Sequence, residues 1–558
     1  MIRALLRWSL MLACAIFCAG FFAYYLYMVL ANTFPGPTVD YWADMDKIAA
    51  LFSPTASVSL QEWLSLHNGA HRLLIPRLLF ALDYYFFDGT NLLLVAVSFL
   101  CRGILLYLLN IGVRHLSLAS RLLVNTIFFA GLFHIAQLNI IVITSNIQWD
   151  LAFAFSFLSV YFFSQTGKHS QALCLLCMLL AIFSNALALA LPPFFVICSL
   201  FFLKGRPWQR HLLLFFIIYI IYFYLLPLWI GESSSSGYRE LFQKDVTSIA
   251  LTLLVLLPNF VIRLIGALTA SLGYLSLYFS FFFIGAMGWL LWKCKSAAQY
   301  DASRHLLLLF GLFCFLAIGT IAGGRAATSP FFYGAGQYAP LGILFMLCIG
   351  GALYVNLPHH FSGTVANALR GALLLHVLFV LMWDQVQLTV AGFPKSNKAL
   401  QSHALMLFTE ANQFSGKGVR RWVQERDVIA ELDPFLKQHG FAWYHNKLPA
   451  ANATPPLDVQ ECTSLPGSPQ YMPTDSGYEL SQPLQLRGLA YFRTAFQRST
   501  YHVLDAQGQT LGYSYFYMPP ESHWPMPELK GYLHKPEARY LAEWRGDRLH
   551  CLYRLDSP

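Results

Sequence analysis

Charged residues are scarce in this 558-residue chain. Asp, Glu, Lys and Arg together make up 12% of the sequence, against about 25% in an ordinary soluble domain. Hydrophobic residues make up 57% and aromatic residues 16%, which excludes a soluble globular protein and indicates a chain that crosses a membrane many times. The formal net charge is +9, but the basic residues form short clusters between apolar runs, so they indicate membrane topology and no nucleic-acid partner.

The sequence also lacks the motifs of several soluble chemistries. It has no Walker-type phosphate loop, no dinucleotide fingerprint after a strand, no pair of Cys-x-x-Cys motifs and no Gly-x-Ser-x-Gly elbow. No cofactor is indicated. The energy for a transfer reaction would therefore have to come from an activated lipid donor.

Cysteine is rare in the polar C-terminal part. Of 11 cysteines only Cys462 and Cys551 lie there. In an oxidising compartment they could form a disulfide that joins the ends of one domain, and otherwise they are two unrelated thiols. The remaining cysteines lie in or beside apolar runs, as small residues facing lipid or helix core.

Long apolar runs dominate the first 392 residues. A crossing needs about 20 apolar residues, and the first run, 4–30, is too long for a signal-peptide core and is interpreted as an uncleaved anchor. With ten later runs it predicts about eleven crossings. The later runs lie near 90–112, 121–143, 147–164, 170–185, 187–203, 209–230, 273–292, 303–322, 336–356 and 367–391.

The basic loops orient these crossings. They fall on the cytoplasmic side when the N-terminus is cytoplasmic, provided that 72–88 and 247–270 lie at the outer face as amphipathic or re-entrant segments. The loop 31–89 and everything after about Phe393 then face outward. Within the run 170–203 the sequence leaves open one long helix or a tight hairpin.

The composition changes after residue 392. Residues 393–456 predict a helical connector that ends in a Pro-rich linker, and 457–558 alternate apolar and polar residues between turn signals. The predicted fold class is an all-α polytopic membrane domain, 1–392, followed by the connector and a small β-rich extracytoplasmic domain, 457–558.

Two polar clusters lie in the outward loop 31–89. The first is Asp40-Tyr41-Trp42-Ala43-Asp44, and the second is His67-Asn68-Gly69-Ala70-His71-Arg72. Charged groups at a bilayer face are costly to hold unless they are solvated or paired. A dense set of them between two membrane segments therefore predicts a functional site.

The order of these features resembles the GT-C superfamily of membrane glycosyltransferases. One span is followed by an outward acidic loop, an amphipathic helix ending at Phe86-Phe87-Asp88-Gly89, and a second span with a basic cytoplasmic end. More narrowly, the two clusters resemble a little-characterised bacterial group with Asp-x-Trp and Asn-Glu-His-Arg-like motifs. Ala70 stands where that group has Glu, which weakens any role for a carboxylate at this position.

The resemblance implies a sugar donor carried on polyprenyl phosphate and an acceptor hydroxyl at the outer face. Direct displacement needs a carboxylate to accept a proton and cations to stabilise the leaving phosphate. Asp40 is the expected base, with Asp44 as the second candidate, and Trp42 offers a face on which a sugar ring can pack. The alternative is that these acids are ordinary loop residues or helix N-caps.

His67, His71 and Arg72 are the expected contacts to donor phosphate or sugar. Arg72 could bind phosphate bidentately, as could Arg77, whose alternative use is to extend into the lipid headgroups. His67 and His71, four residues apart, would share one face of a helix. That is also metal-ligand spacing, but the sequence offers no clear third ligand, so no metal is predicted.

A later outward loop carries Arg325 and Tyr338. It resembles the late loop of the same group, although Gln337 stands where Arg is expected. Arg325 is therefore the expected contact to donor phosphate and Tyr338 a hydrogen-bonding group. The alternative is that Arg325 caps the C-terminus of a helix.

The resulting hypothesis is a bacterial inner-membrane glycosyltransferase. It would move a sugar from polyprenyl phosphate to an envelope glycan or glycolipid, with the N-terminus cytoplasmic and the C-terminal domain periplasmic. A transporter or flippase of lipid-linked glycans and a non-catalytic envelope-glycan assembly protein remain as alternatives, although the sequence shows no matched pair of interrupted spans, the usual sign of inverted repeats.

Overall fold

The computed structural model describes the bundle helices, much of the 41–91 segment and the C-terminal strands. The described residues are 2–33, 41, 44–53, 57–67, 71–165, 167–202, 208–231, 275–296, 305–328, 338–390, 435, 438–439, 441, 461–462, 470–474, 477–483, 499–507, 510–517, 528–533, 540–545 and 548–554.

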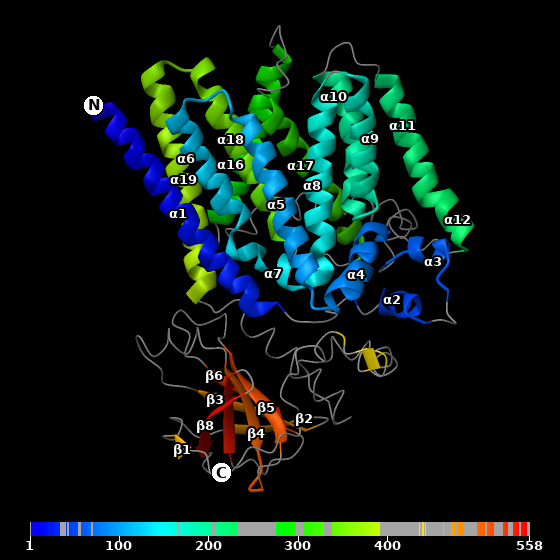
Figure 1. The fold of residues 1–558 in the computed structure, drawn as a ribbon. Helices are drawn as coiled ribbons and strands as arrows, with labels where there is room; N and C mark the ends of the chain where they lie inside the picture. The colour runs from blue at the N-terminus through cyan, green and yellow to red at the C-terminus, as the bar shows by residue number, and fades with distance from the viewer. Residues whose placement is uncertain are drawn as a thin grey trace.

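A bundle of long helices forms most of the molecule (Figure 1). Its helices are α1 (Ile2–Asn32), α5 (Leu92–Gly112), α6 (Leu118–Leu132), α8 (Ile147–Ser164), α9 (Lys168–Ile182), α10 (Leu191–Phe201), α11 (Trp208–Ile220), α12 (Leu226–Ile230), α16 (Leu275–Ser296), α17 (Leu306–Thr328), α18 (Ala339–Asn356) and α19 (Gly363–Val390). Shorter helical pieces connect them: η2 (Ile135–Gln137), α7 (Leu138–Val142), η3 (Thr144–Asn146), η4 (Ala186–Ala190), the π-helix η5 (Ile221–Leu225) and η9 (Leu357–His359).

Six helices among the described residues are long and apolar enough to cross a membrane, and the bent pair α6 and η2–α7 would make a seventh. The protein is thus mostly helical and of the membrane type that the composition predicts. The other predicted crossings fall on shorter apolar helices, so the count of eleven stays a prediction. These shorter helices are Lys168–Ile182, Ala186–Phe201, Ser280–Cys294 and Leu306–Ile321. The predicted re-entrant segment 247–270 lies outside the described residues.

Small residues let the central helices approach closely. A Cβ on Gly112 would lie 2.6 Å from Cγ of Leu307, and one on Gly131 would lie 2.7 Å from Cδ1 of Leu347. Membrane helices gain much of their association energy from such contacts, because lipid provides no hydrophobic force between helices. The α17–α18 hairpin therefore packs tightly in the middle of the bundle, where α18 is almost wholly buried.

Three short helices, α2 (Met45–Leu51), α3 (Leu60–Leu64) and α4 (Leu74–Phe87), lie at one end of the bundle (Figure 1). The helix expected over 72–88 is α4. A separate hydrophobic cluster joins this end to the bundle. It contains buried residues of the short helices and of α5 and α8, among them Tyr41, Ile48, Phe80, Tyr84, Leu94, Ile147 and Leu151.

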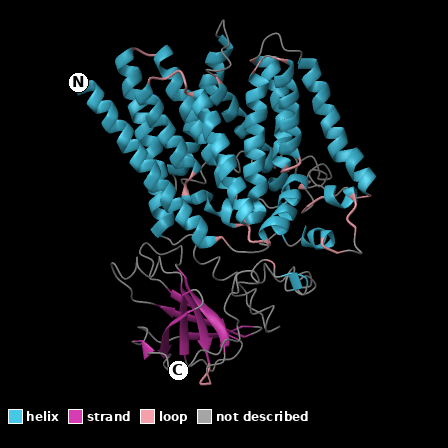
Figure 2. Ribbon diagram, in the orientation of Figure 1, coloured by secondary structure: helices cyan, strands magenta, loops and turns pink. Residues whose placement is uncertain are grey.

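The described strands form one eight-stranded sheet beyond the same end of the bundle (Figure 2). Its spatial order is β1-β8-β7-β4-β5-β6-β3-β2, with antiparallel pairs except β1 and β8, which run parallel. The strands are β1 (Glu461–Cys462), β2 (Gln470–Thr474), β3 (Gly477–Pro483), β4 (Ser499–Leu504), β5 (Thr510–Tyr517), β6 (Glu528–Leu533), β7 (Tyr540–Arg545) and β8 (Arg548–Arg554).

The two C-terminal cysteines lie on neighbouring strands. Cys462 of β1 pairs in register with Tyr553 of β8, and Cys551 is two positions from that partner. The disulfide between them stays a prediction.

Candidate functional site

The end of α3 is held by two arginines. Arg77 Nη1 donates to the carbonyls of Trp63 (2.6 Å) and Ser65 (2.8 Å), and Arg72 Nη1 donates to that of Leu64 (2.6 Å). The last carbonyls of a helix have no partner inside it, so cationic side chains commonly satisfy them. Both arginines are buried, which shows that Arg77 does not extend into the lipid headgroups as one sequence interpretation had it.

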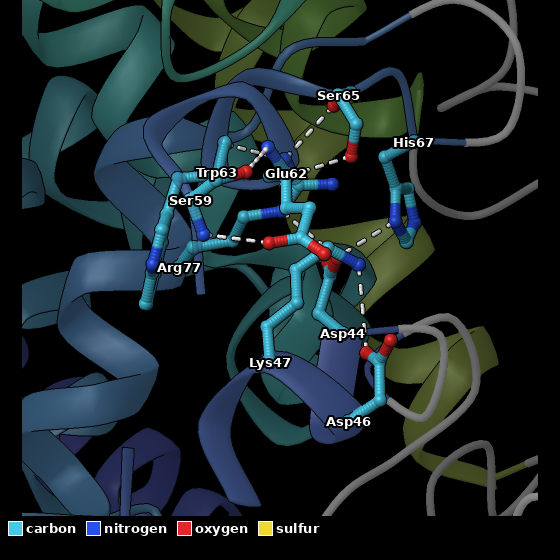
Figure 3. Close-up of polar contacts among 9 residues, drawn as sticks. All are labelled: Asp44, Asp46, Lys47, Ser59, Glu62, Trp63, Ser65, His67 and Arg77. Atoms are coloured by element: carbon cyan, nitrogen blue, oxygen red, sulfur yellow. Dashed lines mark hydrogen bonds and ion pairs between the residues drawn. The ribbon is translucent and has the colours of Figure 1, made fainter. Parts of the chain in front are cut away.

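Asp44 stands immediately before α2 and is buried against the same structure (Figure 3). Its Oδ1 accepts a hydrogen bond from Arg77 Nε at 2.8 Å and lies 3.5 Å from Lys47 Nζ. Its Oδ2 lies 3.1 Å from Nδ1 of His67. The carboxylate therefore joins His67 and Arg77, which are distant from it in the sequence, and its neighbour Lys47. Asp44 occupies the N-cap position of α2, but its side chain makes no capping hydrogen bond.

The charge state of Asp44 follows from these contacts. Burial alone would raise the pKa of this carboxyl, but the His67 hydrogen bond and the charges of Arg77 and Lys47 outweigh burial and hold the pKa below its ordinary value. Asp44 is thus ionised across the physiological range. A carboxylate held this way is a weak proton acceptor, because its proton affinity is low and both oxygens face donors.

His67 and His71 do not share a helix face, so that expectation is wrong. They exchange two backbone hydrogen bonds, from His67 N to His71 O at 2.6 Å and from His71 N to His67 O at 3.1 Å. This antiparallel bridge closes a short loop and fixes the backbone of both residues. In the part of the chain that the structure describes, no three His, Cys, Asp or Glu side chains converge as metal ligands.

Hydrogen bonds lead from His71 into the bundle. His71 Nδ1 accepts from the Ala186 N–H at 3.3 Å, and the neighbouring Asn185 amide donates to Gln148 Oε1 at 2.9 Å. Next to Gln148, the ring of Trp149 meets that of Tyr338 edge-on, with centroids 5.5 Å apart. The structure therefore connects His71 of the second predicted cluster to Tyr338 of the later outward loop, by way of the starts of η4 and α8.

Arg72 also meets the π-helix η5. Its guanidinium carbon lies 5.5 Å from the ring centroid of Tyr222, within the range of a cation–π contact. A π-helical turn rotates the residues that follow it and is frequent at functional sites. Arg72 thereby links α3 to the α11–α12 helix, where Gln61 Nε2 also donates to the Trp229 carbonyl at 3.0 Å.

Several predicted site residues are not placed. Asp40 and Trp42 lie outside the described residues. Arg325 belongs to α17, but its side chain lies outside the description. The predicted site residues that the structure connects, by direct or successive contacts, are Asp44, His67, His71, Arg72 and Tyr338.

Sequence reasoning missed Lys47, and it did not pair Arg77 with Asp44. Lys47 lies three residues after Asp44 on a short helix, a spacing at which opposite charges meet. That signal was present in the sequence. The pairing of Asp44 with Arg77 had no such signal, because the two residues are 33 positions apart.

The connector contributes aromatic residues to this end of the molecule. The rings of Phe435, His439 and Phe441 contact one another, and His439 stacks on Phe441. Phe441 also meets Phe52 and Tyr84, with ring centroids 5.2 and 5.3 Å apart. Phe441 is buried in this contact. The connector thus packs against α2 and α4, the helices that carry Asp44 and Arg77.

A second buried charge pair lies inside the bundle. Arg102 Nη1 donates to the Tyr25 hydroxyl at 2.8 Å and to the Leu132 carbonyl at 2.6 Å, while Nη2 lies 3.4 Å from the Gln137 carbonyl and 3.5 Å from Asp150 Oδ1. The Leu132 carbonyl lies at the end of α6, where the last carbonyls have no partner inside the helix. Arg102 donates to this carbonyl, and Asp150 balances the charge of Arg102.

Asp83 organises the turn between α4 and α5. Its carboxylate accepts hydrogen bonds from the N–H groups of Asn91 (2.8 Å) and Leu93 (3.0 Å), at the start of α5. Asp88, Gly89 and Asn91 all adopt positive φ, and a Cβ on Gly89 would lie 2.6 Å from the Tyr84 ring. Glycine is therefore required at 89, which explains the Asp-Gly turn seen in the sequence.

We expect Asp83 to make stability depend on pH. Burial raises its pKa to about 6, although the hydrogen bonds from Asn91 and Leu93 oppose the rise. The folded protein thus keeps this proton to a higher pH than the unfolded chain, whose aspartates titrate near pH 3.9. The stability that protonation contributes is complete below about pH 4 and is lost as the pH rises to about 6.

Asp83→Asn carries no titrating proton, so its stability relative to wild type should improve by about 2 kcal/mol between pH 4 and pH 6.5. Thermal unfolding of the detergent-purified proteins across this range measures the difference. Asp88→Asn, in the same turn, is the control, because Asn tolerates the left-handed conformation of that position. A constant difference between Asp83→Asn and wild type would contradict the prediction.

Comparison of the chain with protein-family models, with curated proteins and with solved structures finds no match in any of the three.

Proposed function

We propose that the protein is a membrane glycosyltransferase that moves a sugar from a polyprenyl-phosphate donor to an envelope glycan or glycolipid. The observation that supports this function best is the buried cluster of Asp44, His67, Lys47 and Arg77 at one end of the helical bundle. It combines an ionised carboxylate, an imidazole and two cations beside the membrane-spanning helices, where charged groups are costly unless they are paired or functional.

The cluster supplies the two requirements of direct displacement at an anomeric carbon. The Asp44 and His67 pair can take up the proton of the acceptor hydroxyl. Lys47, whose side chain is 14% exposed, and Arg72 are the cations available for the phosphate that leaves. Asp40, Trp42, Arg325 and Tyr338 complete the proposed site as the resemblance to the GT-C superfamily implies.

The proposal includes a topology. The chain crosses a bacterial inner membrane about eleven times, with the N-terminus in the cytoplasm. The site and the β-rich C-terminal domain face the periplasm, where polyprenyl-phosphate sugars are used. Support comes from the position of α2–α4 and of the strands at the same end of the bundle (Figure 1).

Envelope glycolipids and polysaccharides of four strains test the function by mass. The strains carry wild-type protein, no protein, Asp44→Asn or Asp46→Asn. We expect the deletion and Asp44→Asn to lose the same sugar and to accumulate unused donor and undecorated acceptor. Asp46→Asn is the matched control, since Asp46 is exposed and its ion pair within the described residues is with Lys47. Identical profiles in the wild-type and deletion strains would refute a transferase.

A transporter of lipid-linked glycans is the second candidate, favoured by the Arg102–Asp150 pair beside an interrupted helix inside the bundle. It predicts a different result in the same four strains. The deletion would change the envelope profile while Asp44→Asn would not.

A further inference from the structure

The first observation concerns Asp44, which is poorly suited to accept a proton from substrate. Its Oδ1 is engaged by Arg77 and Lys47, and its Oδ2 faces His67 Nδ1 at 3.1 Å. Both oxygens face protein donors, so a substrate hydroxyl could reach the carboxylate only by displacing one of them. Its geometry is that of a group that orients other side chains.

The second observation concerns the other nitrogen of His67. Nε2 is buried, and it has no hydrogen-bond partner among the described residues. A buried polar atom without a partner costs about 1–3 kcal/mol, so its persistence needs an explanation such as a ligand or a catalytic use. The backbone bridge to His71 holds His67 in place, so a simple backbone shift cannot bring Nε2 to a partner.

The third observation is the pairing itself. His67 Nδ1 lies 3.1 Å from Asp44 Oδ2, an ion-pair contact whose angles fall outside strict hydrogen-bond geometry. A carboxylate this close to Nδ1 favours the tautomer that carries its proton there and leaves the lone pair on Nε2. The same pairing stabilises the imidazolium that forms once Nε2 takes up a proton. Lys47 and Arg77 keep the carboxylate ionised, so it remains able to do both.

We infer that His67 Nε2 is the proton acceptor of the transfer reaction and that Asp44 is its positioning residue. The inference rests on the proposed function. The acceptor oxygen forms a bond to the anomeric carbon as its proton passes to Nε2, and the bond from that carbon to the phosphate oxygen breaks. Its electron pair leaves with the polyprenyl phosphate, and the imidazolium later returns the proton to water or to that phosphate.

This assignment differs from the sequence hypothesis, in which an aspartate was the base and His67 a contact to donor phosphate or sugar. Imidazole is matched to proton transfer near neutral pH, whereas a carboxylate tied to two cations is not. A purely structural Asp44–His67 contact would involve Nδ1 alone and would not explain why Nε2 is buried without a hydrogen-bond partner.

Chemical rescue tests the inference in isolated membranes. The probe is a radiolabelled polyprenyl-phosphate hexose. Each variant is expressed in the deletion strain, and the readout is the initial rate at which its membranes transfer the sugar to the acceptor. We expect His67→Ala to transfer at least about 100-fold more slowly than wild type, and imidazole, which fits the space that the side chain vacates, to restore the rate at least about tenfold. His169→Ala, an exposed histidine at the start of α9, is the control and gains nothing from imidazole.

His67→Asn separates structure from chemistry. Its amide N–H can still donate to Asp44 in place of Nδ1, so the fold is kept, but nothing replaces Nε2 as a base. We expect this variant to accumulate normally in the membrane and to transfer as slowly as His67→Ala. Nitrogen NMR of histidine-labelled wild-type protein, assigned by the signal that His67→Asn removes, should show Nε2 unprotonated, and Asp44→Asn should abolish that preference.

The failures are distinguishable. Wild-type membranes that transfer no sugar would overturn the proposed function and the inference with it. Wild-type transfer together with a fully active His67→Asn, or with a His67→Ala that imidazole does not restore, would overturn the inference alone. An Nε2 that carries the proton in the wild-type protein would also overturn it, whatever the transfer rate.

Discussion

Replacing Arg102 with methionine is expected to lower the free energy of unfolding by about 3–5 kcal/mol. The change removes one partner of a fully buried ion pair and leaves the Asp150 carboxylate without a countercharge. It also removes the donor for the Leu132 carbonyl at the end of α6, which has no partner inside that helix, and the longer contact to the Gln137 carbonyl. No other interaction of the described bundle joins α1, α5, α8 and the α6–α7 break at one side chain.

A double variant identifies the origin of this loss. Arg102→Met with Asp150→Asn removes the uncompensated charge but leaves the carbonyls unsatisfied, so we expect it to recover about 1–2 kcal/mol of the loss. Denaturant titration of the purified proteins in detergent measures the three stabilities. If Arg102→Met unfolds at the wild-type midpoint, the pair contributes little and the α6–α7 break is held by packing alone.

The helical segments could be predicted from the sequence because length and apolarity are local properties of a run. The runs 90–112 and 147–164 correspond closely to α5 and α8. The breaks could not be predicted in the same way. The run 121–143 is bent by 40° between α6 and η2, and the run 170–203 divides at Asn185, whose side chain caps η4. Each break is stabilised by side chains from elsewhere in the chain.

The candidate site shows the same limit. Its acidic and basic residues could be located from sequence, because charge beside a membrane segment is unusual. Their arrangement depends on the return of the chain through α3, which brings the carbonyls of Trp63 and Ser65 to Arg77 and His67 to Asp44. The helix expected at 67–71 was inferred from the four-residue spacing of His67 and His71. The backbone instead forms an antiparallel bridge between these two residues.

The second large effect is expected at Arg77. Arg77→Met should lower the free energy of unfolding of the 44–77 region by about 3 kcal/mol or more, since it leaves Asp44 without its closest cation and two α3 carbonyls without a donor. Hydrogen–deuterium exchange of the full-length protein measures it, as lost protection in α3 and α4. Arg114→Met, at an exposed arginine after α5, is the control and should leave protection unchanged.

Combining Arg77→Met with Asp44→Asn separates the charge of Asp44 from the rest of the contact. Asn removes the unpaired charge, so protection should recover in part, while the α3 carbonyls remain without a donor. Transfer activity should not recover with it, because neither change restores the carboxylate that orients His67. Unchanged protection in Arg77→Met would mean that Lys47 and His67 suffice to hold Asp44, and the carboxylate would then be free enough to serve as the base itself.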